Sequence, residues 1–264
     1  MLCVAYADGE AEQWPIPEHE AFDALRRRCA AVSGQAPSLA FRGLRAQPVW
    51  GPSDAGDAIS SLRASLETAF PEIRAEVHQV LRMRDIPHAD AANAPAPAPW
   101  GAQEEGLVRC GTWQKLELWS RGRRSTEVCS LLPTTAAIIA CHSGTAVMLD
   151  APGRCYLSLM MPHTHVAPHC GPTNHRLRLH LPIVLPAAQQ GQPLGIRVGG
   201  SLLCWAAGET LVFDDSFTHS VDFDPEPDPE AESNGARVVL VVDLWHPQAT
   251  RWFPERRRLR TRLE

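Results

Sequence analysis

Apolar residues recur at helical spacing in two stretches of the first third of the chain. In residues 18–33 the apolar side chains lie three or four positions apart, which predicts a helix. Residues 58–85 carry a longer stripe of the same kind, interrupted by Pro71, and this predicts either one kinked helix or two shorter ones. The members of that stripe are Ile59, Leu62, Leu66, Ala69, Ile73, Val77 and Val80.

From Leu107 onward the pattern changes to short runs that alternate between apolar and polar residues or are wholly apolar. Such runs, with turn residues between them, predict strands. Residues 129–140 fit either a short helix or an apolar connection. Strands are predicted at residues 113–119, 145–149, 154–161, 176–185, 193–198, 210–213 and 237–245. We therefore expect a mainly β fold with flanking helices, of the sandwich or barrel type.

Composition and charge narrow the class of protein. The formal net charge of −5 at pH 7 argues against nucleic acid as a partner. No apolar run is long enough to span a membrane, and the N-terminus lacks the basic start and apolar core of a signal peptide, so we expect a cytoplasmic protein. The 8 cysteines form no Cys-x-x-Cys pair, which indicates buried or free thiols.

Histidines are concentrated in residues 161–186, a segment that also contains a Gly-Pro turn and two arginines. Histidine is the commonest metal ligand in proteins. We interpret His169, together with His219 further along the chain, as ligands of Fe(II), which neutral imidazoles suit. Many non-haem iron sites add a carboxylate two residues after the first histidine. Here that position is Gly171, which has no donor atom.

The third position on the metal stays open at this point, because it is either absent or filled by water, substrate or a halide. Asp214 and Asp215 lie near His219 in the sequence, and an orienting role through hydrogen bonds fits them better than direct ligation. His163 and His165 are adjacent on one face and form an alternative metal pair.

A 2-oxo acid would chelate such an iron through its 1-carboxylate and keto oxygen. Its far carboxylate requires a bidentate partner, which Arg237 at the start of an apolar strand can supply, and Ser158 can donate to the same carboxylate. Arg178 and His180 alternate on one strand face and can hold the other end of the oxo acid or a substrate carboxylate.

The chain contains PHCGPTNHRLRLHL at 168–181, GETLVFDDSFTHSV at 208–221 and RVVLVVDLWHP at 237–247, preceded by WQKLELWSRGRR at 113–124. In order and spacing, these segments resemble the aspartyl/asparaginyl β-hydroxylase family. Its members are Fe(II)- and 2-oxoglutarate-dependent dioxygenases that hydroxylate the β-carbon of aspartyl or asparaginyl residues in proteins. The resemblance therefore implies a double-stranded β-helix, a jelly-roll, cupin-like core.

The resemblance also implies a role for each candidate residue. His169 and His219 would bind the iron, and Gly171 agrees with the family's centre of two histidines without a carboxylate. The other site residues would be Ser158 and Arg237 at the distal carboxylate of 2-oxoglutarate, Arg178 and His180 near its other end, and Arg176 at the substrate carboxylate.

The implied organisation has three parts. Residues 1–41 would form an N-terminal helical extension, and residues 248–264 a basic C-terminal tail. Between them, residues 42–247 would form the catalytic domain, with helical support at 58–85 and a β core at 107–247.

One departure from the family leaves the identity of the substrate undetermined. Tyr156 stands where the family has a lysine that lines the substrate pocket. The substrate beside O2 can therefore be a peptide, a protein, a free amino acid, a natural-product peptide or a lipid-linked acyl chain. Two further alternatives are a halogenase, with a halide in the space that Gly171 leaves, and a non-catalytic metal-binding jelly roll.

Overall fold

The computed structural model describes residues 35–37, 40–41, 43–84, 99–102, 106–142, 144–145, 153–186, 194–225 and 235–249. It also gives the backbone of a hairpin formed by β1 (Cys3–Ala7) and β2 (Glu10–Trp14), which the apolar pattern does not predict. The helix predicted at 18–33 and nearly all of the basic tail lie outside the described residues. None of the described helices is both long and apolar enough to cross a membrane.

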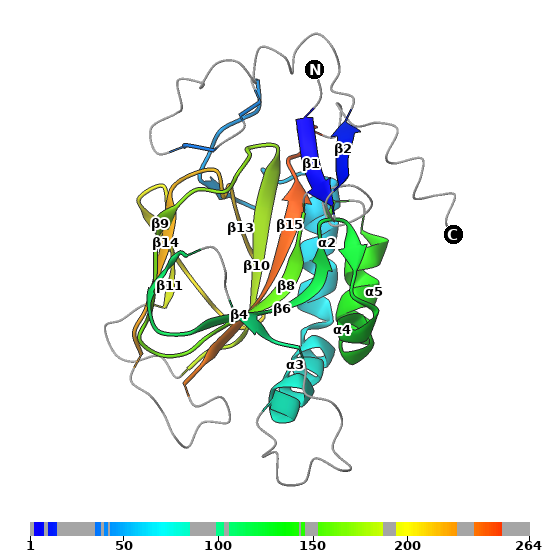
Figure 1. Cartoon of the computed structure of the whole chain (residues 1–264), viewed down its shortest axis with the longest axis vertical. Coiled ribbons are helices and arrows are strands. Elements are labelled where there is room, and N and C mark those ends of the chain that lie inside the picture. The colour runs from blue at the N-terminus through cyan, green and yellow to red at the C-terminus, as the bar shows by residue number, and fades with distance from the viewer. Residues whose placement is uncertain are drawn as a thin grey trace.

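Two antiparallel sheets form the core (Figure 1). The major sheet contains, in spatial order, β3 (Val49–Trp50), β13 (Leu211–Phe213), β10 (Arg176–Val184), β15 (Arg237–Trp245), β8 (Cys155–Met160), β6 (Trp113–Ser120) and β4 (Gly101–Ala102), with β7 (Arg123–Arg124) paired to β6. The minor sheet contains β12 (Ser201–Cys204), β11 (Gly195–Val198), β14 (His219–Phe223), β9 (Thr164–His169) and β5 (Val108–Cys110).

The chain crosses repeatedly from one sheet to the other. It passes from β8 in the major sheet to β9 in the minor sheet, back to β10, across to β11 and β12, and then through β13 and β14 to β15. This alternation is the winding of a double-stranded β-helix, and it confirms the predicted jelly-roll core.

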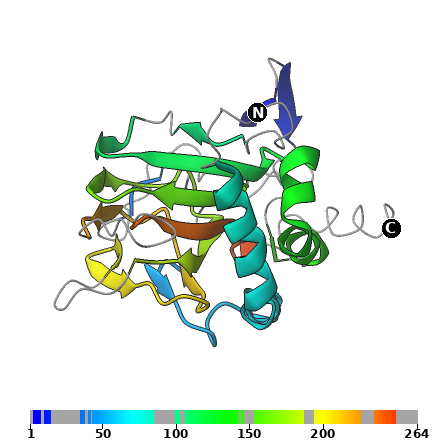
Figure 2. The same cartoon turned by 90° about the horizontal axis from the view of Figure 1, so that it is seen from below.

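Four helices cover the outer face of the major sheet (Figure 2). They are α2 (Asp57–Thr68), α3 (Phe70–Arg84), α4 (Thr126–Leu131) and α5 (Pro133–Cys141). Pro71 lies in the first turn of α3, where its missing N–H costs nothing, so the interrupted stripe forms two helices. The apolar run at 129–140 is also helical, because it falls on α4 and α5.

Strand β10 shows how the sequence builds the two sides of the major sheet. Successive side chains of a strand point to opposite faces. Leu177, Leu179 and Leu181 are fully buried in the apolar core shared with the helices. Arg176, Arg178 and His180 alternate with them and therefore face inward, toward the minor sheet. The polar residues of this strand thus belong to the inside of the jelly roll.

The apolar pattern finds the strands of the major sheet better than those of the minor one. Six of the predicted strands fall on β6, β8, β10, β11, β13 and β15. The run predicted at 145–149 is described only at Thr145, which makes an isolated bridge to Leu244. Most minor-sheet strands, including β9 and β14, are not predicted, because they are short and carry polar residues on their half-exposed face.

Candidate metal and cofactor site

His169 and His219 face each other on the inside of the minor sheet. His169 ends β9, His219 begins β14, and the two residues are Cα partners in the antiparallel register of these strands. Their ring centroids lie 4.1 Å apart with an interplanar angle of 53°. Two imidazoles at this separation can bind one metal ion between them.

Each of the two imidazoles contacts the backbone carbonyl oxygen of the residue two positions before it. The Nδ1 of His169 lies 2.8 Å from the carbonyl oxygen of Ala167, and the Nδ1 of His219 lies 2.9 Å from that of Phe217. When Nδ1–H donates to a carbonyl, the lone pair is on Nε2 and available to a metal. Burial, and then the neighbouring His169, lower the pKa of His219 to about 4, so its ring is neutral at pH 7.

The structure describes no third candidate ligand beside the pair. In the described part of the chain there is no group of three or more His, Cys, Asp or Glu side chains that could hold a metal. The alternative pair, His163 and His165, lies near the other end of β9, and each of these residues pairs with an aspartate of its own, Asp224 and Asp222 respectively.

The carboxylate of Asp215 occupies the space beside Gly171. A Cβ atom on Gly171 would lie 2.3 Å from Oδ2 of Asp215, closer than real Cβ contacts allow. The backbone N–H of Gly171 also donates to the carbonyl oxygen of Asp215. The Oδ1 of Asp215 is buried and has no hydrogen-bond partner among the described residues. A carboxylate oxygen therefore lies beside Gly171, two residues after His169.

We expect Gly171→Asp to destroy the site and not to complete a three-ligand centre. The new side chain would overlap the Asp215 carboxylate, and overpacking of this kind costs about 1–3 kcal/mol before the repulsion between like charges is added. Thermal unfolding and Mn(II) titration would measure both losses. Gly51→Ala is the matched control, because its Cβ would meet an oxygen of the Asp54 side chain at 3.3 Å, which a shift of a few tenths of an ångström relieves. Tighter metal binding by Gly171→Asp would contradict this prediction.

Arg237 and the side chains around it, Ser158, Trp113 and Trp205, form a cluster inside the jelly roll, here called the arginine pocket. Arg237 is 2% exposed, and its guanidinium carbon lies 4.2 Å from the ring centroid of Trp205. Its Nη1 donates to Oγ of Ser158 at 3.3 Å, and the same Oγ accepts from Nε1 of Trp113 at 2.9 Å. The Nε of Arg237 is buried without a hydrogen-bond partner among the described residues. A buried cation in this state calls for an anionic ligand.

His180 lies between this pocket and the histidine pair. Its Nδ1 accepts from Nε1 of Trp205 at 3.4 Å, and its ring centroid is 4.9 Å from that of Phe213. Phe213 in turn lies 5.8 Å from His219. Burial, together with the positive charge of Arg237, lowers the pKa of His180 and keeps its ring neutral. One wall of side chains therefore runs from the arginine pocket to the histidine pair.

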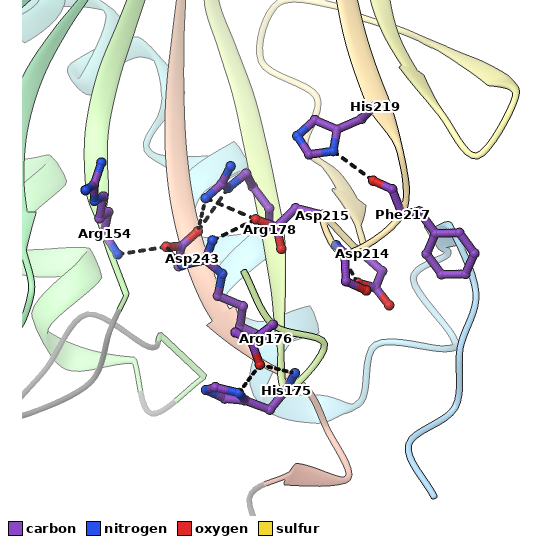
Figure 3. A network of polar contacts seen from close by, with 11 residues as sticks. Arg154, His175, Arg176, Arg178, Asp214, Asp215, Phe217, His219 and Asp243 are labelled. Carbon is purple, nitrogen blue, oxygen red and sulfur yellow. Dashed lines mark hydrogen bonds and ion pairs between the residues drawn. The ribbon is translucent and has the colours of Figure 1, made fainter. Parts of the chain in front are cut away.

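Two arginines and two aspartates form a buried network inside the jelly roll (Figure 3). Arg176 donates through Nη1 to Asp243 at 3.0 Å and through Nη2 to Asp215 at 2.8 Å. Arg178 donates through Nε to Asp243 at 3.0 Å, and its Nη2 lies 3.2 Å from Asp215. Burial tends to raise the pKa of Asp215, but the two guanidiniums outweigh it and hold that pKa below its ordinary value.

The only lysine of the chain lies on the same inner face. Lys115 is 7% exposed and is the Cα partner of Ser158 across β6 and β8. Its Nζ lies 5.0 Å from the ring centroid of Trp113 and 4.8 Å from that of Tyr156. The residue that replaces the expected pocket lysine, Tyr156, thus lies under a lysine ammonium from the neighbouring strand.

The structure brings all seven predicted site residues to the inside of the jelly roll. The minor sheet carries His169 and His219, and the major sheet carries Ser158, Arg176, Arg178, His180 and Arg237. Their assigned roles remain predictions. Sequence reasoning missed Asp243, which fixes both arginines of β10, and the aromatic residues Trp113, Trp205 and Phe213. An isolated acid inside the apolar run VVLVVDLW is a usable signal for Asp243, because a buried charge must be paired.

Asp214 should make the stability of the protein depend on pH. Burial raises its pKa from 3.8 to about 7, although Ser216 donates to its carboxylate. Between these pH values the folded state keeps a proton that the unfolded chain releases, so the contribution of Asp214 to stability falls as the pH rises. Relative to Asp214→Asn, the wild type should lose about 1.4 kcal/mol of unfolding free energy per pH unit in this window. Urea unfolding at several pH values would measure the difference, and parallel curves would contradict it.

A jelly roll whose inner walls carry two facing imidazoles and a buried arginine belongs to the cupin-like double-stranded β-helix proteins. Comparison with known proteins narrows this class. The family model described as aspartyl/asparaginyl beta-hydroxylase matches residues 67–247. The chain belongs to the aspartyl/asparaginyl β-hydroxylase family.

Animal relatives carry the same family name. The aspartyl/asparaginyl beta-hydroxylases of Mus musculus and Homo sapiens are each 34% identical to this chain over 216 residues, or 82% of it. Aspartate beta-hydroxylase domain-containing protein 1 of Homo sapiens is 31% identical over 69% of the chain. These matches cover 25%, 24% and 41% of the respective relatives, so the chain spans about a quarter of the length of the first two.

Two solved structures show a looser likeness. A prolyl-4-hydroxylase of Pseudomonas putida covers 70% of this chain and 98% of its own, with 14% identity and a TM-score of 0.38. An oxidoreductase of the 2OG-Fe(II) oxygenase family from Burkholderia pseudomallei covers 56% of this chain and 73% of its own, with 11% identity and a TM-score of 0.33. The fold assignment rests on the strand order and not on these matches.

Proposed function

We propose that the chain is an Fe(II)- and 2-oxoglutarate-dependent dioxygenase that hydroxylates the β-carbon of an aspartyl or asparaginyl residue in a peptide or protein. The observation that carries the proposal is the combination of two facing imidazoles, of which that of His219 is neutral, with a buried guanidinium whose Nε lacks a partner among the described residues. The first suits a divalent iron, and the second suits the far carboxylate of an oxo acid. Membership of the family supports the same conclusion.

Separate groups of residues would bind the iron and the 2-oxoglutarate. His169 and His219 would hold the iron through Nε2, and Arg237 with Ser158 would hold the distal carboxylate of 2-oxoglutarate. His180 and Arg178 lie closer to the metal position and would contact its other end. Bound iron and oxo acid supply the oxidising power that cleaves a substrate C–H bond with O2. The protein contributes binding and orientation.

Asp215 fits a role beside the open side of the metal. Its Oδ1 needs a hydrogen-bond donor, and a water molecule at the third position would supply one. The same carboxylate fills the space that Gly171 leaves, so its negative charge lies beside the third position. It would also repel a halide, which argues against the halogenase alternative.

The inner wall suits a substrate with a carboxylate. Arg176, Arg178 and Lys115 all lie on this wall, and the family resemblance assigns Arg176 to the substrate carboxylate. Because both terminal nitrogens of Arg176 already donate to carboxylates, we favour a contribution from Lys115 to the same recognition. Tyr156 replaces the family's pocket lysine, and Lys115 lies over its ring. This difference from the family also supports a second candidate substrate class, in which the same chemistry acts on a free amino acid, a natural-product peptide or a lipid-linked chain.

The deciding experiment is an anaerobic titration of the purified protein with Fe(II) and 2-oxoglutarate, followed by visible absorbance. The expected result is a charge-transfer band, and then succinate formation on exposure to O2 that rises when an Asp- or Asn-containing peptide is added. Turnover only with small acids would favour the second substrate class. Bound iron without a band or succinate would overturn the enzyme proposal and favour a metal-binding scaffold.

A further inference from the structure

The segment before α2 contacts both loops that carry the metal histidines. We call the described residues between 35 and 50 the strap. The strap lies outside the part of the chain that the family model matches, residues 67–247. Its first residues belong to the predicted N-terminal extension, yet the structure packs them against the β core. The strap therefore needs an explanation of its own.

The first contact of the strap is with the loop that leads into His219. Gln35 is 7% exposed, forms an antiparallel bridge with Phe217, and donates through Nε2 to Oγ of Ser216 at 2.8 Å and to Asp214 at 3.3 Å. The N–H of Ala36 donates to the carbonyl oxygen of Ser216 at 3.0 Å. Asp214 and Ser216 of this loop are thus hydrogen-bonded to a segment from far away in the sequence.

This contact reaches the metal ligand through one residue. Phe217 is the bridge partner of Gln35, and its carbonyl oxygen lies 2.9 Å from Nδ1 of His219 (Figure 3). That carbonyl sets the tautomer and the orientation of the His219 ring. A displacement of the loop would therefore turn the imidazole away from its partner.

The second contact of the strap is with the loop that follows His169. The N–H of Phe41 donates to Oδ1 of Asn174 at 2.7 Å, and Nδ2 of Asn174 donates back to the carbonyl oxygen of Phe41 at 3.0 Å. The ring of Phe41 also meets that of His175 edge to face at 5.0 Å. Asn174 is buried, so losing its reciprocal pair would leave polar groups unsatisfied.

We propose that the strap is a positioning element of the metal site, in which Gln35 and Phe41 hold the loops of His219 and His169 at the separation that one metal ion requires. The inference rests on the proposed metal site and goes beyond it, because it gives a role to a segment that the family model does not match. The strap acts through Phe217 and Asn174 and touches neither the metal nor the substrate.

The test compares two glutamine substitutions. Gln35→Ala removes the contact with the His219 loop. Gln248→Ala is the matched control, because Oε1 of Gln248 accepts the strap's Arg45 N–H at 2.7 Å, away from the metal loops. Mn(II) affinity by electron paramagnetic resonance should fall about tenfold in Gln35→Ala, the lower end of what outer partners of metal ligands contribute. In Gln248→Ala it should not change. Gln35→Met, which keeps the volume, should behave like Gln35→Ala.

Hydrogen exchange of the metal-free proteins gives a second, metal-independent measurement. Exchange in the peptide that covers residues 214–219 should be faster in Gln35→Ala than in the control. Unchanged Mn(II) affinity in Gln35→Ala would overturn the proposal, as would an equal loss in both variants. If the wild type bound no Mn(II), the proposed function would fail. Faster exchange in Gln35→Ala would then still show that the strap stabilises the loop at residues 214–219. Unchanged exchange would rule out that role too.

Discussion

Replacing either His169 or His219 with alanine should abolish metal binding and turnover. The described residues provide no third His, Cys, Asp or Glu ligand, so each substitution leaves a single imidazole on the metal. A three-ligand centre that loses one ligand retains two, and this site would retain one. We expect succinate formation to fall by more than about a hundredfold, beyond what loss of an outer-shell partner costs.

His163→Ala is the matched control for this prediction. His163 is exposed and pairs with Asp224, so its loss should leave the iron–oxo acid band and succinate formation unchanged. Mn(II) titration separates lost binding from lost turnover. If His163→Ala or His165→Ala abolished metal binding while His169→Ala did not, the metal would belong to the alternative pair.

Replacing Arg237 with methionine should weaken 2-oxoglutarate binding and stabilise the protein. Truncating one partner of a buried, hydrogen-bonded charge pair costs about 2–5 kcal/mol, which corresponds to roughly 30-fold or more in affinity. In the protein without ligand, however, the guanidinium is buried and its Nε lacks a partner among the described residues. An apolar side chain of similar size removes that cost, so the melting temperature without ligand should rise.

The prediction is specific because Arg237→Met should lower the affinity for 2-oxoglutarate and raise the stability. A residue that merely supports the fold would lower stability and binding together. Calorimetric 2-oxoglutarate titration of the Mn(II)-loaded protein measures the affinity, and thermal unfolding without ligand measures the stability. Arg237→Lys is the control, because it keeps the charge and loses the fork that holds a carboxylate with two bonds. Unchanged affinity in Arg237→Met would place the oxo acid elsewhere.

The sequence predicts those parts of the site that depend on alternation along one strand. In β10 the leucines and the polar residues separate onto two faces, so the period of two alone assigns Arg176, Arg178 and His180 to one side. The strands of the minor sheet cannot be found in this way. Strand β9 reads THVAPH, in which a proline and two histidines obscure the period of two.

Contacts between distant strands are the part that no local pattern reveals. Asp243 is the Cα partner of Arg178 only because β10 and β15 pair in one register, and Trp113 reaches Ser158 only because β6 lies beside β8. The aromatic residues of the arginine pocket look like ordinary core residues in the sequence. Their roles follow from the partners that the register gives them.

The space shared by Gly171 and Asp215 constrains how this centre can evolve. It holds one carboxylate, so a lineage that gained a third ligand at position 171 would have to lose the one at 215. Either change alone is harmful, because the first overcrowds the space and the second leaves Arg176 and Arg178 to share one aspartate. We therefore expect the two positions to be epistatic, with a valley of low fitness between a two-histidine centre and a three-ligand one.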